Sequence, residues 1–164
     1  MKTIEKLSNW VYSIEKCLAM LFSIVMLIAL FLGVIYRYVL NAPLVWSDEM
    51  AIYSLVWLTF IGGSMAIKRQ ESASITILVD RLRGKTKQWL ISISILSVLL
   101  FSVFILILSV RWLGSPTISL QYSNSMQMPM VFPYLSVPVG FTFITIHSIH
   151  LFLLNLKTQP EEAA

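Results

Sequence analysis

The stretch that decides the fold is CLAMLFSIVMLIALFLGVIY, residues 17–36, which contains no charged side chain. A helix rises about 1.5 Å per residue, so about 20 apolar residues cross the hydrocarbon core of a bilayer. In hydrocarbon only helices and closed barrels satisfy their own backbone, and this stretch lacks the alternation of a barrel strand. It is too long for a cleavable signal sequence and is followed directly by Arg37. We therefore predict a retained transmembrane helix.

Three further uncharged stretches cover residues 50–67, 88–110 and 133–156. Each is long enough for a span. The chain is 57% hydrophobic and only 12% charged, with a mean hydropathy of +0.80. A soluble domain is about 45–50% apolar and about 25% charged, so a soluble fold and a disordered chain are both excluded. The sequence predicts an all-α integral membrane protein with four transmembrane helices and a single membrane domain over residues 1–164.

Basic residues predict the orientation of the spans. Only Arg37 and Arg111, of the 12 Lys and Arg residues, lie on one side; the others lie in the N-terminal segment, the connector 68–87 and the C-terminal tail. The positive-inside rule places that basic side, with both termini, in the cytoplasm. The net charge of +4 is thus explained by loops facing membrane lipids. No nucleic-acid partner is expected, because no basic run is interleaved with aromatic residues.

Two segments outside the spans are predicted to lie at the membrane surface. Residues 3–16 form an amphipathic extension whose apolar residues recur at helical spacing; these residues are Ile4, Leu7, Val11 and Ile14. Residues 72–84 form a short interfacial helix between the second and third spans. The outer loop 111–133 contains several prolines and many apolar residues, so we expect it on the membrane surface or against a partner.

The predicted spans contain no acidic or basic residue other than His147 and His150. At spacing i, i+3 these histidines share one helix face and form either a metal or haem site or a hydrogen-bonding pair between helices. Ligands to complete a metal site are scarce, with Cys17 the single cysteine, so we expect no cofactor. A haem or redox membrane subunit stays as an alternative. A self-contained four-helix exporter is a second alternative, although such a protein normally needs a buried carboxylate.

The first outer hairpin, RYVLNAPLVWSDE at residues 37–49, is dense in polar and aromatic side chains. Turn formation and helix-end electrostatics explain most of them, and a serine before the acids suits a helix cap. Neither effect requires a tryptophan between the proline and the acids, so docking of another protein is an equal and compatible interpretation. The candidates for hairpin structure or a subunit interface are Arg37, Asn41, Pro43, Trp46, Asp48 and Glu49.

Gly62 and Gly63 begin a patch of small residues in the second predicted span. Small residues let a second helix approach closely. Whether that helix belongs to this chain or to a partner stays open from the sequence.

Residues 37–82, RYVLNAPLVWSDEMAIYSLVWLTFIGGSMAIKRQESASITILVDRL, resemble the small membrane subunit of tripartite ATP-independent periplasmic (TRAP) transporters, the DctQ type. That family shows Arg-Tyr-aromatic-Asn-x-Pro-Leu-x-Trp-x-Glu-Glu, a small-residue patch, a basic turn and a hydrophobic-Asp-Arg-Leu connector. SMQMPM at 125–130 and YLSVPVG at 134–140 resemble its fourth-helix region. This chain departs from the pattern with Asp48-Glu49 for Glu-Glu, and with Ser-Ala-Ser at 72–74 where a His is frequent.

The resemblance implies a non-enzymatic scaffold subunit in the bacterial cytoplasmic (inner) membrane. Its partner would be a large elevator-type permease subunit that carries the substrate and sodium sites. An extracytoplasmic solute-binding protein would deliver an organic acid to this sodium-coupled importer. The resemblance assigns no catalytic or substrate-binding residue to this chain and does not name the substrate.

Overall fold

The structure is a computed structural model that describes residues 2–69 and 85–161. Within these residues every regular element is helical, which confirms the all-α prediction. The long helices are α1 (Lys2–Tyr38), α2 (Val45–Arg69), α4 (Lys85–Leu113) and α7 (Ser136–Glu161). Between α4 and α7 lie two short helices, α5 (Pro116–Ser119) and α6 (Val131–Tyr134).

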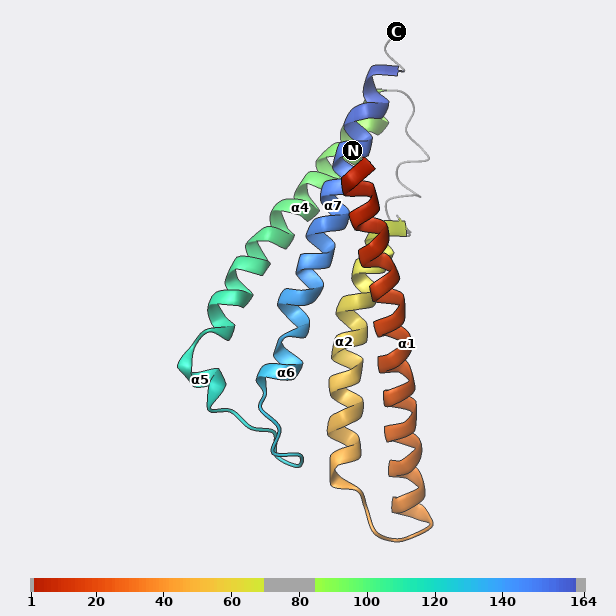
Figure 1. Ribbon diagram of the computed structural model, residues 1–164, viewed down its shortest axis with the longest axis vertical. Coiled ribbons are helices and arrows are strands. Elements are labelled where there is room, and N and C mark those ends of the chain that lie inside the picture. Colours follow the sequence, from red (N-terminus) through yellow and green to blue (C-terminus); the bar gives the residue numbers. More distant parts are fainter. Residues whose placement is uncertain (1, 70–84, 162–164) are drawn as a thin grey trace.

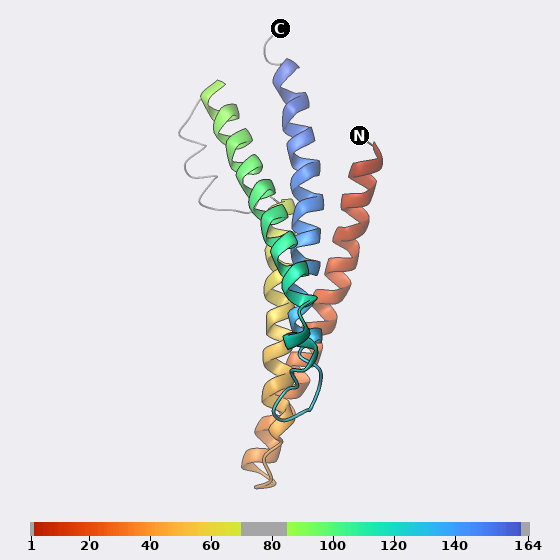
Figure 2. The same cartoon turned by 90° about the vertical axis from the view of Figure 1, so that its left-hand side faces the viewer.

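The four long helices alternate in direction along the chain and pack as neighbours in the order α4, α7, α2, α1, in which α7 and α2 run in the same direction (Figure 1). Figures 1 and 2 show the N- and C-termini at the same end of the molecule. The α1–α2 hairpin and the loop between α4 and α7 lie toward the opposite end (Figure 1). We call the end with both termini the terminal end and the opposite end, with the α1–α2 hairpin, the hairpin end.

Four helices in the described part of the chain are long and apolar enough to cross a membrane. This finding confirms the prediction of four spans. The long helices run past the predicted boundaries, except that α7 begins at Ser136, inside the predicted fourth span. The qualifying segments are Thr3–Tyr38, Val45–Arg69, Trp89–Leu113 and Val131–Asn155. The interfacial helix expected at 72–84 lies outside the described residues, and the single membrane domain stays a prediction.

Helix α1 is continuous from the predicted extension into the predicted span, because no proline or glycine interrupts residues 2–32. Its buried residues in the extension are Ser8, Val11 and Glu15, whereas Leu7 is exposed. The side that packs on other helices therefore overlaps the apolar stripe at Val11 but also carries two polar groups.

Two glycines permit close approach of helix backbones. A Cβ atom on Gly33 of α1 would lie 2.7 Å from the Ser47 hydroxyl oxygen of α2. A Cβ atom on Gly140 of α7 would lie 2.6 Å from the Phe60 Cβ of α2. Both distances are shorter than van der Waals contact, so α2 packs against its two neighbours at positions where any larger residue would collide.

Candidate functional site

The α1–α2 hairpin is closed by an ion pair. Nη2 of Arg37, in the last turn of α1, lies 3.0 Å from Oδ2 of Asp48, in the first turn of α2. Asn41 makes the turn with a positive φ of 50°, a conformation that asparagine tolerates better than most residues. Pro43 follows in the exposed segment before α2. These hairpin residues thus lie together. Asp48, which was expected to complement the start of α2, also bonds to Arg37 of α1.

Ser47 is buried between the two helices. Its hydroxyl donates a hydrogen bond to the Leu44 carbonyl at 2.8 Å. Helix α2 already begins at Val45, so Ser47 lies inside the first turn instead of capping it. The same hydroxyl oxygen faces Gly33 at a distance that leaves no room for a Cβ atom there.

Glu49 connects the α1–α2 hairpin to the loop between α4 and α7. Its carboxylate accepts the backbone N–H groups of Ser125 at 2.9 Å and Met126 at 3.1 Å. These amides form the tip of a narrow loop, which is closed by backbone bonds from Ser123 to the Met128 carbonyl and from Met130 to the Gln121 carbonyl, both at 2.9 Å. The sequence pattern associated Glu49 with the start of the second span or with a subunit interface, and not with the loop between α4 and α7. The long-range contact, across 76 residues, needed the tertiary fold.

Trp46 lies at the exposed edge of the hairpin. Its side chain is 38% exposed and the neighbouring Val45 is 68% exposed. Tyr38, Val39 and Leu40 are also exposed at this end. We name these five exposed residues of the hairpin the hairpin surface; exposed apolar residues gathered at one place mark contact with lipid or with another protein.

A second cluster, which the sequence patterns did not reveal, lies where α1, α2 and α7 meet. Oγ of Ser8 lies 2.8 Å from Nδ1 of His147, and Oε2 of Glu15 lies 3.0 Å from Nε2 of the same ring. Lys68 of α2 donates to Oγ of Ser8 at 3.0 Å. Ser8, Glu15 and His147 are fully buried. We name Ser8, Glu15, Lys68 and His147 the three-helix cluster.

A chain of hydrogen bonds that suits a neutral His147 ring runs through the three-helix cluster. An ammonium group only donates and a carboxylate only accepts. Lys68 therefore donates to Ser8, which leaves the Ser8 hydroxyl proton for Nδ1 of His147. Nε2–H then donates to Glu15. The ammonium group of Lys68 and the carboxylate of Glu15 lie at the two ends of this chain. Oε1 of Glu15 is buried without a hydrogen-bond partner among the described residues, so the burial of the carboxylate is compensated only in part.

Three cationic side chains near the three-helix cluster lie close to the aromatic ring of Tyr12. The charged groups of Lys16, Lys68 and Arg69 lie 4.5, 5.1 and 5.6 Å from the ring centroid of Tyr12. Arg69 also donates to the Tyr12 hydroxyl, and Lys68 to Oδ1 of Asn9 at 2.7 Å. These contacts fasten the last turn of α2 to the N-terminal part of α1.

The three-helix cluster changes two interpretations drawn from the sequence. Both ring nitrogens of His147 are engaged by Ser8 and Glu15, and the described residues hold no group of three or more metal-binding side chains. The geometry therefore favours a hydrogen-bonding His147 over a metal or haem ligand. The predicted first span, residues 17–36, contains no acid, but α1 extends beyond it and buries Glu15, two residues before Cys17.

Gly62 and Gly63 are exposed on α2. Among the described residues, nothing lies within 4 Å of a Cβ atom placed on either glycine. The internal close approaches occur instead at Gly33 and Gly140. A helix that packs on the Gly62–Gly63 patch would therefore come from outside the described part of this chain.

A family match and individual relatives both identify the same protein family for this chain. Residues 9–158 match the family described as tripartite ATP-independent periplasmic transporters, DctQ component. The C4-dicarboxylate TRAP transporter small permease protein DctQ of Vibrio cholerae is 22% identical over 161 residues, which cover 85% of this chain and 69% of that protein. This family consists of transporter components and not of enzymes.

Two further relatives align over shorter segments. The isethionate TRAP transporter permease protein DctMQ of Oleidesulfovibrio alaskensis is 29% identical over 113 residues, which cover 64% of this chain but only 16% of that protein. The sialic acid TRAP transporter small permease protein SiaQ of Vibrio cholerae is 35% identical over 51 residues, 31% of this chain and 30% of that protein. These two alignments each cover less than two thirds of the relative.

Proposed function

The chain belongs to the DctQ component family of TRAP transporters, and from that membership we propose that it is the small scaffold subunit of a sodium-coupled, binding-protein-dependent importer. In this proposal a large elevator-type permease subunit carries the substrate and sodium sites. Membership in the family and four span-capable helices make the chain a multi-pass protein of the bacterial inner membrane. The terminal end and the hairpin end of the molecule then face opposite compartments.

A large permease partner is implied by the relatives. In the DctMQ protein the aligned segment makes up only 16% of the molecule, so a segment like this chain is there joined to a much longer polypeptide. The other two relatives are named small permease proteins. Their names mention isethionate, C4-dicarboxylate and sialic acid, and these organic acids support the same chemical class for the cargo of the proposed transporter.

The proposed orientation puts the terminal end in the cytoplasm. Lys16, Lys68 and Arg69 lie at that end, as the positive-inside rule requires. The hairpin surface and the loop held by Glu49 then face the periplasm. This is the side from which a solute-binding protein would reach the transporter.

The hairpin surface is the observation that carries the docking part of the proposal. Trp46 is held in place by the closed hairpin yet remains partly exposed, and tryptophan is enriched at the centres of protein interfaces. We assign Trp46 to the contact with the large subunit, with Arg37, Asn41, Pro43, Asp48 and Glu49 holding the hairpin in shape. The exposed Gly62–Gly63 patch is the proposed site for a close helix contact in the bilayer.

Reconstitution tests the function. The chain alone in proteoliposomes is expected to transport nothing, whereas the chain with its large subunit and binding protein is expected to take up an organic acid along a sodium gradient. Sodium-driven uptake by the chain alone would overturn the scaffold assignment. Export of a toxic cation by the lone chain would instead support the small-exporter alternative, and a haem absorption band would support the redox alternative.

Mutation of Trp46 tests the docking surface. Trp46→Ala is expected to lower co-purification with the large subunit, because hot-spot tryptophans contribute roughly 2 kcal/mol or more to binding. Trp89→Ala is the matched control, since Trp89 is also exposed but lies near the start of α4. Equal loss in both variants would remove the specific role assigned to Trp46.

A further inference from the structure

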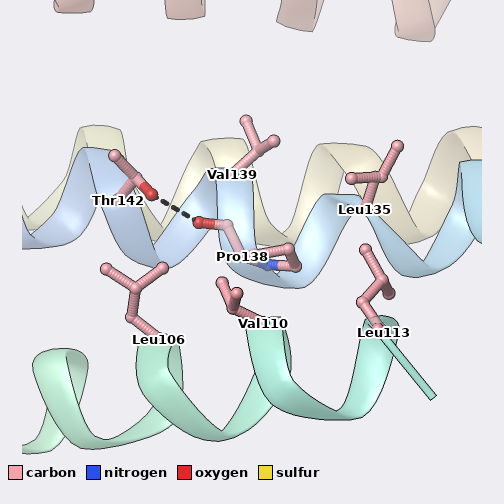
Figure 3. A pocket seen from close by; sticks show the side chains of 8 residues that line it. Leu106, Val110, Leu113, Leu135, Pro138, Val139 and Thr142 are labelled. Atoms are coloured by element: carbon pink, nitrogen blue, oxygen red, sulfur yellow. Dashed lines mark hydrogen bonds between the residues drawn. The ribbon is translucent and has the colours of Figure 1, made fainter.

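An apolar groove lies between the last turns of α4 and the first turns of α7 (Figure 3). Its volume is 470 Å³. It belongs neither to the hairpin surface nor to the three-helix cluster. The side chains that form most of its walls are Leu106, Val110, Leu113, Leu135, Pro138 and Val139.

The groove runs along the two helices and offers an occupant no hydrogen bond from its one polar side chain. In Figure 3 Leu113 lies opposite Leu135 at one end, and Leu106 lies toward Thr142 at the other. The Thr142 hydroxyl donates to the Pro138 carbonyl at 2.7 Å, so its proton is used within α7. Burial of apolar surface is therefore the main energy available to an occupant.

The outer end of the groove has the features of a membrane interface. The rings of Trp112 and Tyr134 lie 4.8 Å apart, and such aromatic residues mark the level of lipid headgroups. Arg111 is exposed in the same turn of α4. In the part of the chain that the structure describes, Arg111 makes no ion pair, whereas Arg37 is paired with Asp48.

We propose that the groove binds one acyl chain of a glycerophospholipid whose phosphate pairs with Arg111. The apolar walls match the acyl chain, and the cation lies at the level where the phosphate would be. The exposed cation beside the groove favours a phospholipid over an apolar partner helix, because an anionic phosphate complements Arg111 and an apolar helix does not. The site does not depend on the scaffold function; only its assignment to the outer leaflet rests on the proposed orientation.

Native mass spectrometry of the full chain, released from vesicles of phosphatidylethanolamine and phosphatidylglycerol, tests the site. One phospholipid is expected to remain bound. Val139→Phe fills the groove and is expected to abolish retention, while Val103→Phe, on α4 but outside the groove, leaves it unchanged. Arg111→Gln keeps the walls intact and is expected to weaken retention roughly fivefold, against no change for Arg37→Gln.

Crosslinking locates the occupant in the assembled complex. A phospholipid with a photoreactive group in its acyl chain is expected to label Val110 or Val139 in the wild-type chain, both alone and with the large subunit. Retention that is equal in wild type, Val139→Phe and Arg111→Gln would overturn the proposal. It would also be overturned if Val139→Cys crosslinked to the large subunit and the lipid label disappeared from the complex.

Discussion

Nε2 of His147 lies 3.0 Å from Oε2 of Glu15, although 132 residues separate the two side chains along the sequence. Both side chains are fully buried. The contact connects the N-terminal part of α1 to α7, and Lys68 connects α2 to the same cluster through Ser8. A buried pair of this kind destabilises a fold most when only one partner is removed, because the other is left uncompensated.

Glu15→Ala leaves Nε2 of His147 buried without its partner and is therefore expected to lower the free energy of unfolding by roughly 1–3 kcal/mol. Its measurement is a thermal or denaturant unfolding curve of the purified chain in detergent. Glu15→Gln retains an oxygen that accepts from Nε2–H and is expected to cost less. Glu5→Gln is the control, because Glu5 is exposed on the same helix. A loss for Glu15→Ala no larger than for Glu5→Gln would contradict a stabilising role for the pair.

Glu49→Gln is expected to loosen the outer loop. An amide side chain offers one accepting oxygen, whereas the carboxylate accepts from both Ser125 and Met126. Faster hydrogen exchange at these two amides is the readout, measured by mass spectrometry of the loop peptide. Asp48→Asn removes a neighbouring charge that bonds to Arg37 instead, and it should leave exchange in this loop unchanged. Equal exchange in wild type and Glu49→Gln would show that the loop holds its shape without the carboxylate.

Gly140→Ala is expected to destabilise the chain by about 1–3 kcal/mol through overpacking. The added methyl group meets Phe60 at its Cβ atom, which cannot move without the α2 backbone. Gly62→Ala is the matched control: it adds the same methyl group where the described residues leave open space, and alanine favours helix over glycine. A lower melting temperature for both variants would mean that the α2–α7 contact is not the cause.

Gly33→Ala tests the contact between α1 and α2 in a different way. The added methyl group meets the Ser47 hydroxyl oxygen at 2.7 Å, so removal of that oxygen relieves most of the collision. Ser47→Ala is expected to restore part of the stability that Gly33→Ala removes, although each single change is unfavourable. A double-mutant cycle on unfolding free energies measures this coupling. Strictly additive effects would indicate that the two residues do not meet.

Asp48→Asn is expected to change the unfolding free energy by less than about 1 kcal/mol. The side chains of Arg37 and Asp48 are 50% and 59% exposed, so solvent screens their attraction. The same denaturation measurement serves as the test. A loss as large as that of Glu15→Ala would indicate that the pair is covered, for example by another subunit, under the conditions used.

The sequence predicted many residues of the candidate site but not the contacts that these residues make. Arg37 and Asp48 are close in sequence and were expected at the end of the first span and the start of the second. Their ion pair follows because a short turn brings these two helix ends together. The partners of Glu49 and His147 lie 76 and 132 residues away. Local spacing contains no information about which loop or helix will be the neighbour at such separations.

The predicted apolar face of the α1 extension shows the same limit. Ile4, Leu7, Val11 and Ile14 form a regular stripe, yet Ser8 and Glu15 are buried while Leu7 is exposed. Periodicity identifies a face that avoids water, but in a membrane protein lipid satisfies that face as well as protein does. Polar groups, which lipid cannot satisfy, then turn toward other helices.

The sequence by itself determined that this protein is a helical membrane chain with four spans, because the spacing of charged residues and the thickness of a bilayer leave few alternatives. Its hairpin pattern also indicated the family. Only the tertiary structure decided which polar residues meet: Glu15 with His147, and Glu49 with the loop at Ser125. The physical reason is that insertion depends on the hydropathy of each segment alone, whereas helix neighbours depend on shape and hydrogen bonding between segments far apart in the chain.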